Sequence, residues 1–344
     1  LAPQRPQEMR RMRFIGYWLT NRTARRTAGV LLWLYQRLGL QFLLRRTRLL
    51  GHGPLARLES LLPAVTLPWR LSARNPVRFD KLTANGKYQT ETVRPEPVEG
   101  QSQQQSKVAL FTGCTGELAD RQTLEDAIHV LNRIGVSVEV PQAQGCCGAL
   151  HQHAGLNAEA RKLLANNLRA FDDDGMPILS PASGCGATLM EYPQIAGVEF
   201  RASTVAFAGR VQDLNAFLLA HWPANLALKP LHARVLVHTP CTLRNVMKKA
   251  GAVTSLLKKI PGVEIAELDK TGGCCGAAGS YFITQPQMAD ALLEKKLAAA
   301  RDLAPDFIVS ANIGCSLHLA AGLRRDGIKV PVLHPVSLLA RQLA

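Results

Sequence analysis

Two pairs of adjacent cysteines, each enclosed by glycines, constrain this chain more than any other feature. The pairs are Gly145-Cys146-Cys147-Gly148 and Gly273-Cys274-Cys275-Gly276. One further cysteine stands at a similar distance before and after each pair, which gives the sets Cys114, Cys146, Cys147, Cys185 and Cys241, Cys274, Cys275, Cys315. These two sets account for all 8 cysteines of the chain. The sequence therefore contains one four-cysteine site in two copies.

The cysteines favour metal ligation over disulfide bonds. Disulfide frameworks are typical of short secreted chains, whereas this chain has 344 residues. A bridge between neighbouring cysteines would also strain the peptide between them. The sequence shows no signal peptide, and no apolar run approaches the roughly 20 residues that span a bilayer. We therefore expect thiolate-bound metal in a reducing, cytoplasmic compartment.

The net charge of +15 is concentrated near the N-terminus. Residues 1–90 contain 17 of the 41 Lys and Arg residues but only 3 of the 26 Asp and Glu residues, so the remaining body is close to neutral. A basic arm on a neutral body is not the footprint of a folded nucleic-acid-binding domain. Because no recognised binding motif accompanies the charge either, we expect no nucleic acid among the partners.

This arm, residues 1–87, carries an apolar stretch between basic ends. Leucines, Val30, Trp33 and Phe42 dominate residues 28–44, with arginines before and after them. We expect one or two helices here, which either pack on the body or a partner or lie in an anionic membrane surface. Residues 88–106 are rich in Pro, Glu, Gln and Ser, and this composition predicts a flexible linker.

From residue 107 onward, short apolar segments alternate with amphipathic ones. The predicted strands are 108–111, 136–140, 178–180, 234–238, 263–268 and 307–310. The predicted helices are 118–133, 154–171 and 285–303, with another around Leu256. This alternation predicts an α/β fold made of two tandem Rossmann-like units with parallel sheets, in residues 107–222 and 223–344.

The cysteines follow the C-terminal ends of the predicted strands. In open α/β sheets ligands bind at that edge, so three loops of each half would bring four sulfurs together. Helix N-termini at the same edge supply N–H groups that favour thiolates. Four thiolates suit an iron–sulfur cluster or zinc, but structural zinc sites usually space paired cysteines about two to four residues apart. Adjacent cysteines therefore favour iron–sulfur, with zinc and unligated thiols as alternatives.

The order Cys, Cys-Cys-Gly, Cys, present twice, resembles the cysteine-rich CCG domain. That domain occurs in heterodisulfide reductase, anaerobic glycerol-3-phosphate dehydrogenase, lactate-utilisation proteins and glycolate oxidase. Three segments are similar to the glycolate oxidase iron–sulfur subunits in particular: GCCGALHQHAG at 145–155, CCGAAGSY at 274–281 and ANIGCSLHL at 311–319. The resemblance covers residues 107–344 well and the basic arm loosely.

The resemblance implies one iron–sulfur cluster, of the [4Fe-4S] type, in each CCG domain. Its ligands would be the eight cysteines named above. Members of the wider family often end each set with Cys-x-x-Cys, but the matching positions here are Thr188 and His318. His318 is therefore a further candidate ligand, although a buried histidine bonded to a carbonyl is the plainer interpretation. For His151 and His153, a quinone or proton-transfer role stays open.

Family members of this type begin with a ferredoxin-like module that carries two cysteine-rich runs. No cysteine precedes Cys114 in this sequence. We therefore expect the chain to be a truncated form, or a separate chain to supply that module.

Nothing in the sequence suggests that the chain is catalytic alone. It lacks a Gly-x-Gly-x-x-Gly pattern after a strand, and no nucleophile–base pair indicates hydrolysis. The resemblance implies an oxidoreductase complex in which flavin-containing glycolate oxidase subunits, carrying FAD, oxidise glycolate to glyoxylate. This chain would pass the electrons toward a quinone, as a cytoplasmic protein held peripherally on the inner membrane face.

Two alternatives to this function remain open. The first is a subunit that serves D-lactate or another 2-hydroxy acid, or a heterodisulfide-reductase-like complex. The second is a zinc-stabilised scaffold protein without a redox role.

Overall fold

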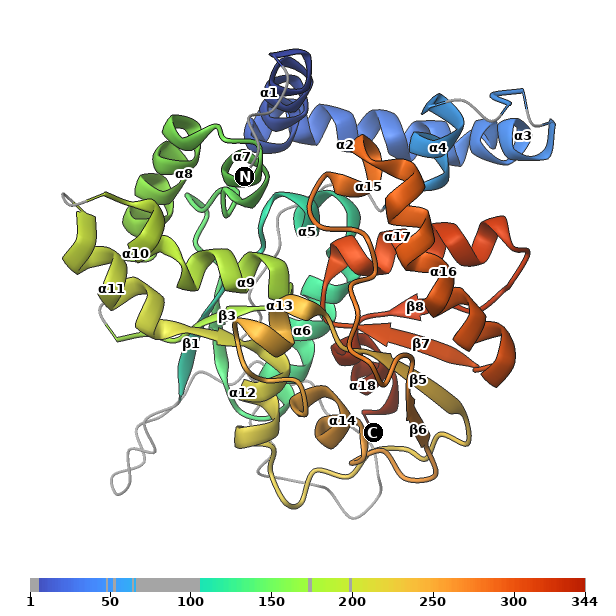
Figure 1. The fold of residues 1–344 in the computed structure, drawn as a ribbon. Coiled ribbons are helices and arrows are strands. Elements are labelled where there is room, and N and C mark those ends of the chain that lie inside the picture. The colour runs from blue at the N-terminus through green and yellow to red at the C-terminus, as the bar shows by residue number, and fades with distance from the viewer. Residues whose placement is uncertain are drawn as a thin grey trace.

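The computed structural model describes residues 6–47, 49–51, 54–63, 65, 106–172, 175–197 and 200–343. The predicted linker, 88–106, lies outside the described residues except for Ser106, as do residues 66–87 of the arm. The described parts form two parallel sheets surrounded by helices, with the helices of the arm crossing the top of both units (Figure 1). The predicted α/β fold of two tandem units is therefore confirmed.

Each sheet has four parallel strands in the same order. The order is β2-β1-β3-β4 in the first sheet and β6-β5-β7-β8 in the second. The strands are β1 (Lys107–Leu110), β2 (Ser137–Glu139), β3 (Ile178–Ser180), β4 (Val211–Asp213), β5 (Arg234–His238), β6 (Glu264–Glu267), β7 (Phe307–Ser310) and β8 (Val332–Leu333). The strands β4 and β8 were not predicted from the sequence.

The central strands are apolar on both faces because helices cover both sides of a parallel sheet. Leu110 pairs with Leu179 in the first sheet, and Val237 pairs with Val309 in the second. All four side chains are almost fully buried. The central strands thus hold the loops at their C-terminal ends in fixed positions.

Helices fill the connections between the strands. In the first unit they are α5 (Cys114–Ala119), α6 (Arg121–Arg133), α7 (Ala149–His153), α8 (Asn157–Ala170), α9 (Ser183–Met190), α10 (Tyr192–Ile195), α11 (Arg201–Arg210) and α12 (Leu214–His221). In the second they are α13 (Cys241–Asn245), α14 (Ala252–Leu257), α15 (Tyr281–Thr284), α16 (Pro286–Leu303), α17 (Ile313–Arg325) and α18 (Pro335–Gln342).

The two units exchange their last helices. Helix α12 follows the first sheet but packs on α14 of the second unit, and α18 follows the second sheet but packs on α6 of the first. One core cluster accordingly contains Val108 and Leu131 from the first unit together with Val235, Leu256 and Leu339 from the second. The shared core fixes the two cysteine sets relative to each other.

The apolar stretch 28–44, for which one or two helices are expected, lies in α2 (Arg22–Arg37) and α3 (Leu40–Thr47). The arm also contains α1 (Pro6–Thr20) and α4 (Pro54–Ser60). Asn21 separates α1 from α2, because its side chain accepts a hydrogen bond from the backbone N–H of Ala24 at 3.0 Å and so caps α2. Gly39, at φ +72°, ends α2 in a backbone conformation that glycine adopts without strain.

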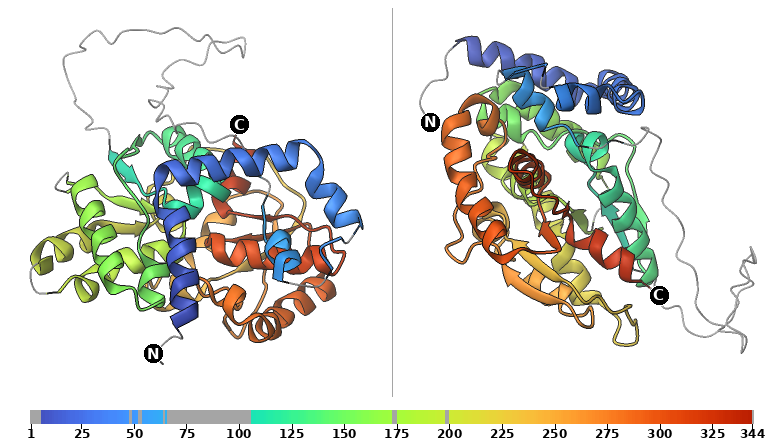
Figure 2. Two further views of the ribbon diagram at one scale, coloured as in Figure 1. Left: turned by 90° about the horizontal axis from the view of Figure 1, so that it is seen from above. Right: turned by 90° about the vertical axis from the view of Figure 1, so that its right-hand side faces the viewer.

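The arm lies along both units (Figure 2), and polar and apolar contacts hold it there. Arg25, only 5% exposed, donates a 2.6 Å hydrogen bond to Glu117 on α5 of the first unit. Arg57 donates to both carboxylate oxygens of Asp290 on α16, at 2.7 and 3.0 Å. Leu61 joins Cys275 and Cys315 in one buried apolar cluster. The arm therefore packs on the cysteine-bearing side of both units.

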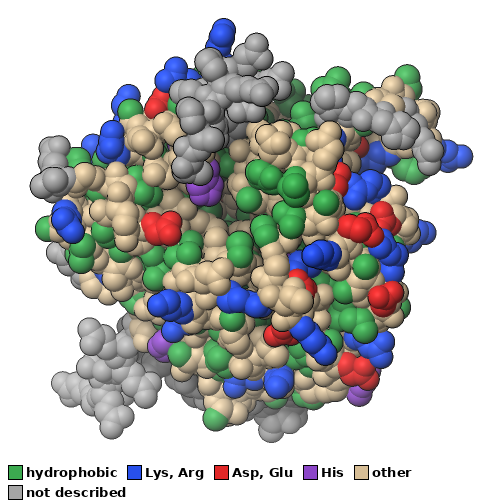
Figure 3. All heavy atoms as spheres, viewed as in Figure 1, with side chains coloured by type: hydrophobic (Ala, Val, Ile, Leu, Met, Phe, Trp, Pro, Cys, Tyr) green, Lys and Arg blue, Asp and Glu red, His purple; other side chains and the backbone are tan. Residues whose placement is uncertain are grey.

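The surface of the body agrees with its near-neutral charge. Figure 3 shows acidic and basic side chains interspersed over the face of the second unit. Within the described ranges, no helix combines the length and the apolar character needed to cross a membrane.

Candidate metal centre

The strand order places both cysteine sets at the same point of their sheets. In each sheet the strand order reverses at the first strand, so that β1 has β2 on one side and β3 on the other, and β5 likewise has β6 and β7. In open α/β sheets the crevice at such a reversal, outside the C-terminal strand ends, is the usual ligand site. Cys114 and Cys185 lie in the first turns of the helices that follow β1 and β3. Cys241 and Cys315 occupy the same places after β5 and β7.

The first set forms a compact, mostly buried group of thiols. Sγ of Cys114 donates to Sγ of Cys146 at 3.3 Å, and the backbone N–H of Gly148 donates to the same sulfur at 3.4 Å. Cys147 interacts with both Cys146 and Cys185. The hydrogen bond with Cys146, and then burial, raises the pKa of Cys114 well above its usual value. The thiol of Cys114 therefore keeps its proton until a cation displaces it.

In the second set, hydrogen bonds lower the pKa of two thiols, Cys274 and Cys315. Hydrogen bonds from Cys241 and Cys275 lower the pKa of Cys274, which also accepts from the backbone N–H of Gly276 at 3.3 Å. The same bonds raise the pKa values of Cys241 and Cys275. Nδ2 of Asn312 donates to Sγ of Cys315 at 3.2 Å. The structure therefore brings each predicted set of four cysteines together.

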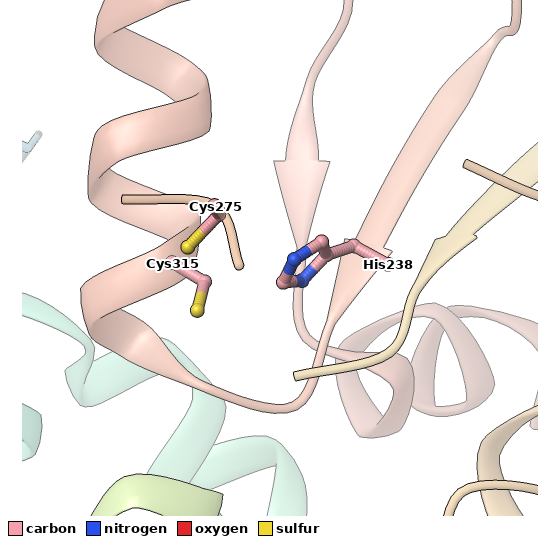
Figure 4. A group of neighbouring side chains, drawn as sticks. All are labelled: His238, Cys275 and Cys315. Carbon is pink, nitrogen blue, oxygen red and sulfur yellow. The ribbon is translucent and has the colours of Figure 1, made fainter. Parts of the chain in front are cut away.

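His238, which the sequence analysis did not single out, lies beside the second set. The ligand atoms of His238, Cys275 and Cys315 all lie within 4.8 Å of one another, and Figure 4 shows the imidazole ring directed toward the two cysteines. Burial, reinforced by the charge of Lys296, lowers the pKa of His238 to about 4, so the ring is neutral. The only sequence signal was its position at the end of a strand, shortly before Cys241.

His318, the predicted extra ligand, lies on α17 and outside this three-residue group. Its Nε2 is 3.5 Å from Oδ1 of Asp290, and its ring lies against Phe282 with centroids 5.4 Å apart. Burial lowers its pKa. At the matching position of the first unit, Thr188 donates a hydrogen bond to the carbonyl of Gly184.

A buried amide holds the loop of the first cysteine pair. Asn167, which has no exposed surface, accepts from the N–H of Gly145 at 2.9 Å and donates to the carbonyl of Cys146 at 2.9 Å. It also donates to the hydroxyl of Tyr192 at 2.8 Å, and that hydroxyl donates to the carbonyl of Cys147 at 3.1 Å. Each polar atom of this network is satisfied, so the network fixes the backbone of both cysteines.

We expect Asn167→Ala to lower the free energy of unfolding by about 3 kcal/mol, because buried donors and acceptors lose their partners. Chemical denaturation of the metal-free chain measures this loss. The matched control is Asn166→Ala, whose side chain makes one bond, at 2.9 Å, to the carbonyl of Ala143 on the surface. The control should cost about 1 kcal/mol or less. Equal losses of stability in the two variants would contradict the role of Asn167 in holding the loop of the first cysteine pair.

An ion pair takes the place of this amide in the second unit. Lys296 lies on α16, which follows the second cysteine pair as α8 follows the first, and pairs with Asp269. Oδ2 of Asp269 in turn accepts from the N–H of Gly273 at 3.1 Å. The Lys296 side chain is only 2% exposed, so the second set has a buried positive charge nearby. Such a charge favours thiolates.

Hydrogen bonds also connect the two sets across the unit boundary. Oδ1 of Asn312 accepts from the N–H of Gly184 at 3.2 Å, while its Nδ2 donates to Sγ of Cys315. Gly184 is bonded covalently to Cys185, so one amide side chain links a cysteine of each set. The N–H of Ser183 also donates to the carbonyl of Ala311 at 2.9 Å. The sets are thus joined by a short path of covalent and hydrogen bonds.

The residues present fit an iron–sulfur centre in each unit. Four sulfurs converge from three loops, as cluster ligation requires. Backbone N–H groups point at Cys146 and Cys274, and hydrogen bonds to sulfur are among the means by which proteins tune such clusters. All eight cysteines belong to the described residues and are free.

Comparison with known proteins supports the same assignment. The family model of the cysteine-rich CCG domain matches residues 108–190 and 235–320, and the model of the glycolate oxidase iron–sulfur subunit linker region matches 6–62. The lactate utilization protein A of Geobacillus kaustophilus is 27% identical over 235 residues, 68% of this chain and 98% of the relative. The uncharacterized protein YkgE of Escherichia coli is 27% identical over 234 residues, 67% of this chain and 98% of the relative.

A further relative matches nearly the whole chain. The probable glycolate oxidase iron–sulfur subunit of Bacillus subtilis is 33% identical over 323 residues, which are 91% of this chain and 68% of the relative. The match includes the helical arm as well as both cysteine sets, which are also the parts that the family models cover. The chain therefore belongs to the glycolate oxidase iron–sulfur subunit family, whose members carry tandem cysteine-rich CCG domains.

Proposed function

We propose that the chain carries electrons from a flavin-containing partner, which oxidises glycolate to glyoxylate, to a quinone at a membrane surface. The observation that carries this proposal is the pair of four-cysteine sets linked through Asn312. Residues 107–222 and 223–344 would each hold one [4Fe-4S] cluster through the four cysteines of that unit. When bound, such clusters accept and release single electrons, which is what the transfer from a two-electron flavin requires.

The residues around the two cysteine sets fix the cysteine loops and exclude water from one side. Asn167 and Tyr192 fix the first cysteine pair, and the ion pair of Lys296 with Asp269 fixes the loop of the second. Leu19 and Leu61 of the arm pack against the first and second sets and exclude water from that side. Fixed surroundings of this kind limit the reorganisation that accompanies each electron transfer.

The outer face of the arm supports an acceptor at the membrane. Most of the large apolar side chains that are exposed in the described residues lie on the arm, among them Phe14, Leu31, Leu38 and Phe42. Arginines are interspersed with them. An apolar helical surface with basic residues matches a helix layer that lies on anionic lipid, and we place the chain in the cytoplasm on the inner membrane face.

A cavity beneath this face offers a place for the acceptor. It has a volume of about 480 Å³ and lies between α3, α4 and α17, where Leu44, Arg57, His318 and Arg324 contribute to its wall. His318 stands one helical turn from Cys315, and its Nε2 lies 3.5 Å from Oδ1 of Asp290, which also lines the cavity. Apolar side chains such as Leu44 and Leu61 line the cavity together with several arginines, and the arginine N–H groups are donors for a quinone ring whose oxygens accept hydrogen bonds.

We expect the double variant Leu31→Glu/Leu38→Glu to bind vesicles of phosphatidylglycerol and phosphatidylcholine about 100-fold more weakly, because each leucine contributes ~1.5 kcal/mol on burial in lipid. These side chains are 59% and 69% exposed, so the fold should be unaffected. Vesicle co-sedimentation measures the binding. The control Val205→Glu changes a side chain on the body that is 56% exposed. If the control weakens binding as much, the arm is not the membrane-binding face.

The proposed function is tested by isolating the full chain anaerobically with its bound partners. We expect iron and acid-labile sulfide in the chain and flavin in a partner. Glycolate should reduce the flavin first and the iron–sulfur absorbance next. Stoichiometric zinc without sulfide would overturn the redox role. Reduction by D-lactate but not glycolate would assign the complex to the other substrate.

A further inference from the structure

Next to the sulfurs, the first unit has Phe111 where the second unit has His238. In the sheet register, Leu110 pairs with Leu179 and Val237 pairs with Val309, so the next residues, Phe111 and His238, are equivalent. Both side chains are buried at the end of the first strand of their unit. Phe111 carries no ligand atom, whereas the imidazole of His238 belongs to a group whose ligand atoms lie within 4.8 Å. The second set thus has a nitrogen donor where the first has a hydrocarbon ring.

A hydrogen bond holds the imidazole in the orientation of a ligand. Nδ1 of His238 lies 3.0 Å from Oγ of Ser310, which is its partner in the sheet register. When Nδ1–H donates to this hydroxyl, Nε2 keeps a lone pair, and metal-binding histidines are typically oriented by such a bond. The equivalent serine of the first unit, Ser180, bonds the carbonyl of Ala182 instead. The serine is therefore common to both units, but only the second uses it to hold an imidazole.

We propose that Nε2 of His238 binds iron in the second centre in place of one of the four cysteines, so that this centre has mixed nitrogen and sulfur ligation and a higher reduction potential than the first. This inference rests on the proposed iron–sulfur function. A neutral imidazole adds no negative charge, and histidine ligation raises the potential of iron–sulfur centres. The buried Lys296 acts in the same direction, because a positive charge stabilises the reduced, more negative centre. Electrons from the reduced flavin would then collect in the second centre, beside the cavity beneath the arm.

The experiment compares the full chain with two variants after anaerobic reconstitution. His238→Phe copies the first unit, and His238→Cys offers a thiolate in place of the imidazole. Phe111→Leu is the matched control at the equivalent position. Pulsed electron paramagnetic resonance of the reduced protein detects strong coupling to a ligand nitrogen, and a redox titration follows both centres. Iron and sulfide are measured on the same samples.

The unchanged chain and Phe111→Leu should show a strongly coupled nitrogen, which both His238 variants lose. The higher of the two potentials should fall in whichever His238 variant retains its second centre. If His238→Phe loses that centre, restoration of its iron by His238→Cys without the nitrogen signal also supports ligation. A nitrogen signal that is absent from the unchanged chain, or that survives in the His238 variants, overturns the inference. Absence of sulfide in the unchanged chain refutes the proposed function itself.

Discussion

Cys146→Ser is expected to remove the first centre and to leave the second, so that iron and sulfide per chain fall to half. Cys146 is central to its set, since it accepts hydrogen bonds from Cys114 and Gly148 and is bonded to Cys147. A serine hydroxyl is a poor ligand for iron that prefers thiolates. Iron and sulfide analysis after anaerobic reconstitution measures the change. Thermal unfolding followed by circular dichroism should show that the fold is retained.

Cys274→Ser is the mirror-image control for this prediction. It should also halve the iron, but the centre that survives should be the first, which the redox titration identifies by its potential. The double variant should bind no cluster. Each set is complete within its own unit, which is why the two losses should be independent. If either single variant lost both centres, the sets would form one site rather than two.

The fold and the cysteine sets could be predicted because both leave marks that repeat along the sequence. Apolar runs such as those around Leu110 and Val309 are long enough to indicate buried strands. In a parallel sheet, the loops that follow the strands all lie at one edge, so the cysteines in these loops come close to one another there. The cysteines from Cys241 to Cys315 are spaced like those from Cys114 to Cys185, and this repeat predicts the second unit.

The exchange of helices could not be predicted from the sequence. Helix α18 is amphipathic, and its pattern shows that one face is buried but not which unit covers it. The same holds for the arm, whose leucines face both the body and solvent. Its inner face is defined by single contacts such as Arg25 with Glu117, residues that are far apart in the sequence. Such contacts depend on the tertiary structure alone.

Two residues beside the second cysteine set, Lys296 and His238, could not be predicted from the sequence either. Lys296 follows another lysine in a helix, and such pairs are usually exposed, yet it is buried because Asp269 pairs with it. His238 is a single histidine at a strand end, without a spacing that marks a ligand. Its proximity to Cys275 and Cys315 results from the parallel alignment of β5 and β7. Only the folded chain brings these groups together.

The glycines that follow the two cysteine pairs should respond very differently to the same substitution. Gly148 and Gly276 both have a left-handed backbone, at φ +91° and +84°, which costs an alanine about 1–2 kcal/mol. In the first unit an added Cβ would lie 3.6 Å from the carbonyl oxygen of Ala160, an ordinary contact. In the second it would overlap the carbonyl oxygen of Ala289 and lie 2.9 Å from its Cα. Gly148→Ala should therefore cost only the backbone strain.

Gly276→Ala should cost about 3–4 kcal/mol, because overpacking against the backbone of α16 adds roughly 2 kcal/mol to the strain. The backbone of α16 cannot move aside without displacing Leu293 and Leu297 from their buried cluster, so the loop of Cys274 and Cys275 must shift instead. Iron should consequently be lost from the second centre and retained in the first. Denaturant unfolding and metal analysis of both alanine variants measure the two effects. Equal losses of stability would show that the close approach of the loop to α16 is not what positions the second cysteine pair.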